Sequence, residues 1–157
     1  MAKSKYDYLV TSDIVRRPAK NFVLYPPGIG MIFFALKNSS FQIRFTHVSE
    51  PFEGREVAHK HDFDEVFLFV PCDVDPGAYD AETELYVGDK GEKIIINRTC
   101  AVHMPAGLMH CPIIHKRVGT PFFFVNSPIT PEYTAFIDGK RERASVPSMN
   151  ASNVELK

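Results

Sequence analysis

Closely spaced chain-breaking residues limit this chain to short secondary-structure elements. Its 157 residues include 12 prolines and 9 glycines, and the segments between them are rich in Phe, Ile, Val, Thr and Tyr. These residue types suit a pleated, half-buried surface, whereas helical periodicity is weak. About ten short strands separated by turn signals are typical of a sandwich or barrel. The sequence therefore predicts an all-β fold, a single-domain antiparallel β-barrel.

The expected strands follow one another along most of the chain. They are Asn21–Tyr25, Met31–Lys37, Phe41–Val48, Glu56–His61, Glu65–Val70, Glu82–Val87, Lys93–Asn97, Cys100–Met104, His110–His115 and Pro121–Asn126. Helical turns are expected only near Thr11–Arg16 and Pro131–Ile137. The second has Thr130 as a possible N-cap and Gly139 just past its end.

Length and charge narrow the domain organisation and the classes of function. We expect an N-terminal arm over residues 1–20, a barrel domain over residues 21–137 and a polar C-terminal tail over residues 138–157. The formal net charge of -1 gives no electrostatic reason to expect nucleic acid or an anionic membrane as partner. No apolar run approaches the roughly 20 residues that span a bilayer. The amino terminus lacks the apolar stretch of a secretory signal, so we expect a cytoplasmic protein.

The cysteines and the acidic loop at Cys72–Ala81 offer weaker signals. Three cysteines are too few and too far apart for a disulfide framework or a paired-cysteine zinc site, and we interpret them as small buried apolar residues. Cys111 stands apart because it follows His110, although nothing marks it as an activated nucleophile. A calcium site is an alternative for the acidic loop, but its spacing does not match the EF-hand and we expect a solvated loop.

The stretch "AHKHDFDEVFLFV", residues 58–70, carries the first set of metal-ligand side chains. On a strand, side chains at i and i+2 share a face, so His59 and His61 project together while Lys60 faces away. The following "DFD" turns and Glu65 opens the next strand, so a hairpin can bring its carboxylate back beside the imidazoles. Two neutral imidazoles and a carboxylate suit divalent iron, manganese, nickel or zinc.

The stretch "MPAGLMHCP", residues 104–112, supplies a fourth donor. The pattern predicts the end of one strand, a Pro-x-Gly turn and then His110 at the start of the next strand. Pro105 sets one backbone angle and Gly107 allows a tight reversal, so the turn gives His110 the rigid support that a metal ligand needs. A single histidine on a strand is usually an ordinary hydrogen-bonded group. The combination of H-x-H-x3-E with P-x-G-x2-H predicts a metal site.

These two stretches resemble the conserved motifs of the cupin superfamily, G-x5-H-x-H-x3,4-E-x6-G and G-x5-P-x-G-x2-H-x3-N. The resemblance runs from about Phe41 to Asn126 and implies a small jelly-roll-like barrel, or double-stranded β-helix, with the metal inside. The metal ligands that it implies are His59, His61, Glu65 and His110, and the supporting turn is Pro105 and Gly107. The chain departs from the motifs only at positions that do not ligate the metal, namely Gly54, Cys72, Thr99 and Ile114.

The remaining pocket lining depends on strand register, which one sequence leaves open. In "FQIRFTH", residues 41–47, an inward Arg44 would anchor a substrate carboxylate. An ordinary exposed charge is the alternative, and the one we favour for Arg44. His103 lies on the strand that leads to the ligand turn, so it is the second candidate for contact with substrate. The interpretation that we favour is that His103 is an ordinary structural histidine.

The function that the resemblance and the donors suggest first is a metal-dependent enzyme acting on a small organic molecule. One divalent ion would polarise substrate oxygens or dioxygen as a Lewis acid, with dioxygenation expected for ferrous iron and decarboxylase, lyase, isomerase or hydrolytic chemistry for manganese, nickel or zinc. Glu65 is the catalytic candidate, either staying bound or swinging away as a base. The alternative is a non-catalytic barrel that binds a metabolite. Exposed edges and flanking arms predict a homodimer.

Overall fold

The computed structural model describes residues 14–16, 31–36, 39–54, 56–143 and 153–154. Regular structure in this part of the chain consists of strands, which confirms the all-β prediction. The strands are β1 (Val15–Arg16), β2 (Met31–Leu36), β3 (Gln42–Val48), β4 (Phe52–Glu53), β5 (Glu65–Pro71), β6 (Ala81–Val87), β7 (Glu92–Ile96), β8 (Cys100–Met104), β9 (His110–Val118), β10 (Phe122–Pro128), β11 (Thr134–Ile137), β12 (Lys140–Arg143) and β13 (Asn153–Val154). Among the described residues no helix has the length and apolar character needed to cross a bilayer.

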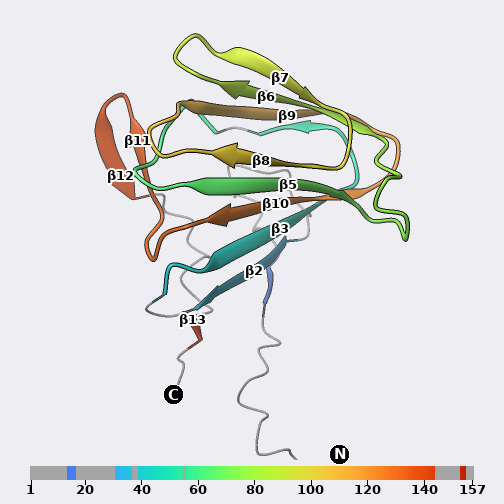
Figure 1. Cartoon of the computed structure of the whole chain (residues 1–157), viewed down its shortest axis with the longest axis horizontal. Coiled ribbons are helices and arrows are strands. Elements are labelled where there is room, and N and C mark those ends of the chain that lie inside the picture. The colour runs from blue at the N-terminus through green and yellow to red at the C-terminus, as the bar shows by residue number, and fades with distance from the viewer. Residues whose placement is uncertain (1–13, 17–30, 37–38, 55, 144–152, 155–157) are drawn as a thin grey trace, which may run out of the picture.

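Two sheets form the barrel (Figure 1). The larger has the order β1-β2-β3-β10-β5-β8, with β13 pairing in parallel to β2, and the smaller has the order β4-β9-β6-β7. Every second residue of β3 and β5 is buried, as expected for strands with one face against a core. The core between the sheets is largely aromatic and aliphatic and includes Val48, Phe67, Phe69, Leu85, Ile113, Phe122 and Phe124.

Most expected strands are found close to their predicted limits, and the exceptions lie at the amino-terminal end and in the His-x-His stretch. Glu56–His61 is not a strand, because only isolated bridges form at His59 and Lys60. Val15–Arg16 pairs with β2 as a strand, so the helical turn expected over Thr11–Arg16 is wrong at its described end. The strand expected at Asn21–Tyr25 lies outside the described residues.

The region expected to be a helical turn belongs to a β-hairpin. Thr134–Ile137 pairs with Lys140–Arg143, so the helical turn expected near Pro131–Ile137 is wrong there, and the hairpin includes the first residues of the predicted polar tail. Asp138 and Gly139 join the two strands with φ of 49° and 76°. A two-residue loop with two positive φ angles is the turn that matches the twist of paired strands, and Asp-Gly is its preferred sequence. The Asp138-Gly139 turn and the pairing of the two strands therefore determined the structure of this segment, rather than the possible helix N-cap at Thr130.

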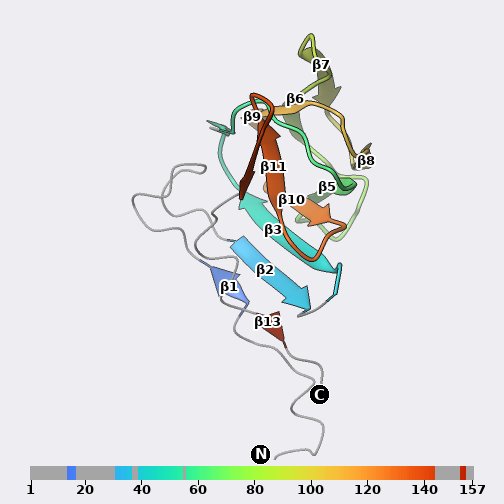
Figure 2. The ribbon, with the colours of Figure 1, turned by 90° about the vertical axis from the view of Figure 1, so that its left-hand side faces the viewer.

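The β11–β12 hairpin attaches to the His-x-His stretch at one end of the barrel. Lys60 and Phe136 exchange two backbone hydrogen bonds, with N···O distances of 3.2 and 2.7 Å. Figure 1 shows the hairpin at the end where β5 begins and β8 ends, and Figure 2 shows it in front of the barrel strands. The hairpin therefore holds the histidine segment against the barrel.

Candidate metal centre

The predicted metal donors reach one place from both sheets. Glu65 opens β5 in the larger sheet, and His110 opens β9 in the smaller. The His-x-His stretch lies beside β9, because His59 and His110 exchange backbone hydrogen bonds of 3.0 and 2.8 Å. The expected hairpin between the His-x-His stretch and β5 is therefore wrong. The carboxylate meets the imidazoles across the barrel interior.

Three of the four predicted ligands place their donor atoms within 4.8 Å of one another: His61, Glu65 and His110. Glu65 Oε2 lies 3.2 Å from His61 Nε2 and 3.2 Å from His110 Nε2. The fourth, His59, packs its ring beside them, with its centroid 4.6 Å from that of His110. Its donor atom groups with those of His110 and Cys111. All of these side chains are buried.

The three histidines are held in one tautomer by backbone carbonyl groups. Their Nδ1 atoms lie 2.7 Å from Val57 O for His59, 2.6 Å from Thr134 O for His61 and 3.0 Å from Leu108 O for His110. A carbonyl oxygen can only accept, so each Nδ1 carries the proton and donates it. In a neutral ring the lone pair is then on Nε2. This outer hydrogen bond is typical of metal-ligating histidines.

The buried carboxylate of Glu65 lies beside histidine Nε2 atoms that, in neutral rings, are also hydrogen-bond acceptors. Glu65 Oε1 accepts a hydrogen bond from Asn126 Nδ2 at 3.2 Å. Among the described residues, the buried Glu65 Oε2 has no hydrogen-bond partner. It lies 3.2 Å from the Nε2 atoms of His61 and His110, which present lone pairs to it whenever their rings are neutral. A buried anionic oxygen facing lone pairs is costly unless a cation lies between them. The residues present therefore fit a divalent transition-metal ion.

The pKa values of the site indicate which of its side chains are charged at neutral pH. Burial lowers the pKa of His59 to about 4, so its ring is neutral at pH 7. Burial raises the pKa of Glu65, but the adjacent His110 and His61 rings outweigh burial and hold that pKa below its usual range. Burial also lowers the pKa of His110, yet Glu65 and the Leu108 carbonyl outweigh it and raise the pKa overall. At neutral pH the centre thus holds an ionised carboxylate that attracts a cation.

The turn at Pro105–Gly107 lies where the sequence predicts and supports two of the donors. Pro105 O accepts a hydrogen bond from Leu108 N–H at 3.1 Å, and Gly107 has φ of 86°, which favours glycine. Gly107 N–H donates to His61 O at 2.8 Å. The same turn therefore positions the backbone of His61 and leads directly into His110.

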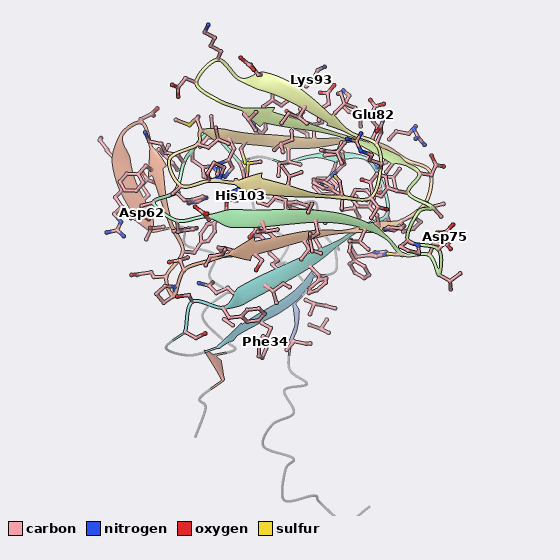
Figure 3. The ribbon with its side chains drawn as sticks, in the orientation of Figure 1. Phe34, Asp62, Asp75, Glu82, Lys93 and His103 are labelled. Atoms are coloured by element: carbon pink, nitrogen blue, oxygen red, sulfur yellow. The ribbon has the colours of Figure 1, made fainter. Side chains whose placement is uncertain are left out.

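His103 lies outside the cavity, on the exposed side of β8 (Figure 3). Its side chain is 61% exposed, and Nε2 lies 2.9 Å from Asp64 Oδ2. The other oxygen of Asp64 accepts a hydrogen bond from Ala106 N–H at 2.9 Å. His103 is therefore the hydrogen-bonded structural histidine that the sequence favoured, and its side chain does not face the barrel interior. The histidine instead supports Asp64, which holds the ligand turn.

Arg44 faces the barrel interior and is only 6% exposed. The exposed orientation that the sequence favoured is therefore wrong, and the inward alternative is the one observed. Arg44 pairs in register with Asn126 on β10, beside the metal donors. A cavity of about 220 Å³, counted to its open mouth, adjoins the donors. Its lining consists of Arg44, Glu56, His59, Phe67, His110, Cys111, Ile113, Phe124, Asn126 and Tyr133.

Tyr133 is a site residue that the sequence motifs do not include. Its hydroxyl lies 3.2 Å from His61 Nε2, and the two ring centroids are 4.8 Å apart. Since His61 Nδ1 carries the ring proton, the phenol donates to Nε2. Tyr133 comes from the segment just before β11, which was expected to be helical. The Asp138-Gly139 pair was the signal that could have placed this segment in a hairpin beside the histidines.

Comparison with known proteins supports the fold. No family model matches the chain, and no curated protein matches its sequence. Among solved structures, a conserved protein with a double-stranded β-helix domain from Klebsiella pneumoniae has a TM-score of 0.53 and 15% identity, covering 89% of this chain and 99% of that protein. A predicted oxalate decarboxylase from Thermotoga maritima has a TM-score of 0.51 and 14% identity, covering 75% of this chain and 94% of that protein.

A cupin superfamily protein from Desulfitobacterium hafniense also matches, with 15% identity and a TM-score of 0.46 over 65% of this chain and 77% of that protein. The first two likenesses and the sheet order support the same fold. The chain has a double-stranded β-helix fold, as predicted from the sequence. At these identities the likenesses concern the fold alone.

Proposed function

We propose that this chain is a metal-dependent enzyme that acts on a small organic acid. One divalent transition-metal ion is held by the predicted ligands His59, His61, Glu65 and His110. The observation that carries the proposal is the buried, donor-free Glu65 Oε2 among imidazoles whose Nδ1 atoms are all fixed by carbonyl groups. Bound there, the ion supplies Lewis-acid polarisation of a substrate oxygen or, if it is ferrous iron, activation of dioxygen.

The cavity supports an acidic substrate of modest size. Arg44 brings a buried positive charge to one wall, and a guanidinium pairs well with a carboxylate. Phe67, Ile113 and Phe124 form apolar lining. The enclosed room in the cavity is about 10 Å³, roughly one water molecule, and the rest of its space opens to solvent, so a substrate there is small. We therefore propose that Arg44 orients a small carboxylate toward the metal.

Glu65 and Tyr133 have different proposed roles. The hydrogen bond from Asn126 and complete burial hold Glu65 in place, which supports a lasting ligand over a base that swings away. Tyr133 donates to His61 Nε2 in the metal-free chain. Once that lone pair is used by a metal, the phenol needs another acceptor. A substrate oxygen in the adjoining cavity can take this role, and Tyr133 then orients it.

The proposal is tested by turnover of small carboxylic acids. Protein loaded separately with Fe²⁺, Mn²⁺, Ni²⁺ or Zn²⁺ is incubated with keto, hydroxy and aromatic acids, and oxygen uptake and product masses are recorded. We expect turnover with one metal and one acid class, and a raised KM for Arg44→Gln. Binding of acids without turnover under any of these metals would favour a non-catalytic barrel. Absence of both binding and turnover would contradict the proposed substrate class.

Homodimerisation and a cytoplasmic location stay predictions. The first is checked by analytical ultracentrifugation, where a single 17.7 kDa species at micromolar concentration would contradict it. The second is checked by fractionation of the native cells, where recovery in another compartment would contradict it.

A further inference from the structure

The strand that carries His110 contains a β-bulge next to the metal centre. Leu85 pairs with Ile113 and Val87 pairs with His110, so three residue steps on β9 oppose two on β6. A bulge of this kind adds one residue to a strand and can redirect a side chain. The added residue changes the alternation of β9 next to the metal donors.

Cys111 is the side chain that this irregularity turns inward. His110 and Cys111 follow one another yet are both buried, at 3% and 6% exposure, whereas regular alternation would send one of them outward. Cys111 has φ of 78°, a left-handed conformation that residues with a side chain rarely adopt. Such outliers persist where the surrounding structure demands them, and they cluster at functional sites. The thiol thereby reaches the cavity lining.

The inward thiol completes a second set of metal donors. His59, His110 and Cys111 place one donor atom each within 4.8 Å of one another, and all three side chains are buried. His59 Nδ1 is used by Val57 O, so its Nε2 lone pair is available to a metal. This set shares His110 with the set formed by His61 and Glu65.

We propose that Cys111 is a thiolate ligand in a second binding mode of the metal centre. In this mode His59, His110 and Cys111 hold a thiophilic divalent ion, such as zinc or cadmium. Harder ions such as manganese are held through Glu65 and the imidazoles. The inference rests on the metal centre of the proposed function and adds to it a rule for which donors each ion uses.

The chemistry of the donor atoms explains why the two binding modes prefer different metal ions. Thiolates prefer softer ions, whereas carboxylates prefer harder ones such as manganese. On binding, the S–H bond of Cys111 breaks, a sulfur–metal bond forms and the proton leaves to solvent through the open cavity. No oxidant is needed, because the sulfur keeps its oxidation state. Since both sets need His110, the centre holds one ion at a time.

The test compares Mn²⁺ and Cd²⁺ on the full chain after removal of metals with a chelator. Affinities are measured by titration calorimetry, and thiolate coordination of Cd²⁺ by its near-ultraviolet charge-transfer band. We expect the wild type to bind both ions and to show the band with Cd²⁺. Cys111→Ser removes the band and weakens Cd²⁺ binding by at least about tenfold. The same variant keeps its Mn²⁺ affinity, which also shows that it is folded.

Two further variants sharpen the comparison. Glu65→Gln weakens Mn²⁺ binding by at least about tenfold and retains the Cd²⁺ band. A Cys72→Ser/Cys100→Ser variant retains the band, because neither thiol belongs to the donor set. A Cd²⁺ complex without the band, or a band that survives Cys111→Ser, would overturn the inference while Mn²⁺ binding still supports the proposed centre. A wild type that binds neither ion would overturn both.

Discussion

The two ends of the barrel interior each bury a histidine from β9, and their surroundings differ completely. His110 lies among two further imidazoles and the Glu65 carboxylate. His115 packs against the rings of Phe52 and Phe122, with centroids 4.7 and 5.4 Å away, and its Nδ1 is hydrogen-bonded to the Thr83 hydroxyl at 2.8 Å. The same residue type on the same strand thus belongs to a donor cluster at one end and to an aromatic core at the other.

This difference shows that burial alone does not define a metal ligand. Burial lowers the pKa of both His59 and His115 to about 4, so both rings are neutral at pH 7 and both offer a lone pair. Only His59 lies where other donors converge. The pairing of each Nδ1 with a carbonyl, and the donor-free Glu65 Oε2, distinguish the metal end from the structural end.

The largest expected difference between the two ends is in metal content. His110→Ala removes a donor common to both ligand sets, so we expect it to lose bound metal almost completely. His115→Ala leaves every donor in place and retains about one metal ion per chain. Both variants are loaded identically, desalted and analysed by inductively coupled plasma mass spectrometry. Metal retained by His110→Ala, or lost from folded His115→Ala, would show that the two ends do not differ in metal binding.

For the free energy of unfolding of the metal-free chain, we expect a larger loss in His115→Ala than in His110→Ala. His115 is 2% exposed and surrounded by aromatic rings, so His115→Ala leaves a cavity and an unpaired Thr83 hydroxyl. We expect the free energy of unfolding to fall by about 2–4 kcal/mol. Urea denaturation of the metal-free variant, compared with the metal-free wild type, measures this loss. A change within about 0.5 kcal/mol would show that the aromatic end tolerates the vacancy.

The structural end also predicts a pH dependence. The unfolded His115 ring takes up a proton near pH 6.5, whereas the folded ring does so only near pH 4. Proton uptake therefore favours the unfolded chain as pH falls between these values, and stability is complete above pH 6.5. His115 contributes a loss of about 2 kcal/mol between pH 7 and pH 5. Urea midpoints of metal-free His115→Phe should depend less on pH than those of the wild type, and equal slopes would contradict this.

The smallest expected effect concerns the support of the ligand turn. Asp64→Ala removes the acceptor of Ala106 N–H and the partner of His103, so the turn before His110 is held less firmly. We expect metal affinity to fall by about tenfold, as is common for outer supports of metal ligands. Asp62→Ala is the matched control, because that exposed carboxylate contacts Arg141 instead. Equal affinities of the two variants in calorimetry would show that the turn needs no such support.

The donor set could be predicted from the sequence because its signals are local. His59, His61 and Glu65 lie within seven consecutive residues, and the turn before His110 is marked by Pro105 and Gly107. The alternation of short apolar segments likewise identified most barrel strands. His115 has no such companions in the sequence, so its structural role follows only from the packed core.

Features that depend on long-range register escaped prediction. Arg44 faces inward because β3 pairs with β10 in a register that no single strand specifies. Cys111 faces inward because a bulge breaks the alternation of β9. Tyr133 reaches His61 through the β11–β12 hairpin, for which Asp138-Gly139 was a readable signal that competed with a helix-capping pattern.

We propose above all that His61, Glu65 and His110 bind one metal ion together, with His59 as the fourth ligand, and anomalous diffraction can locate that ion. Crystals of protein saturated with Mn²⁺ would be measured with long-wavelength X-rays that enhance the manganese signal. We expect one strong anomalous peak about 2.0–2.3 Å from Glu65 Oε2 and from the Nε2 atoms of His61 and His110. A peak confined to the acidic loop near Asp73 and Asp75, or no peak from the barrel interior, would contradict it.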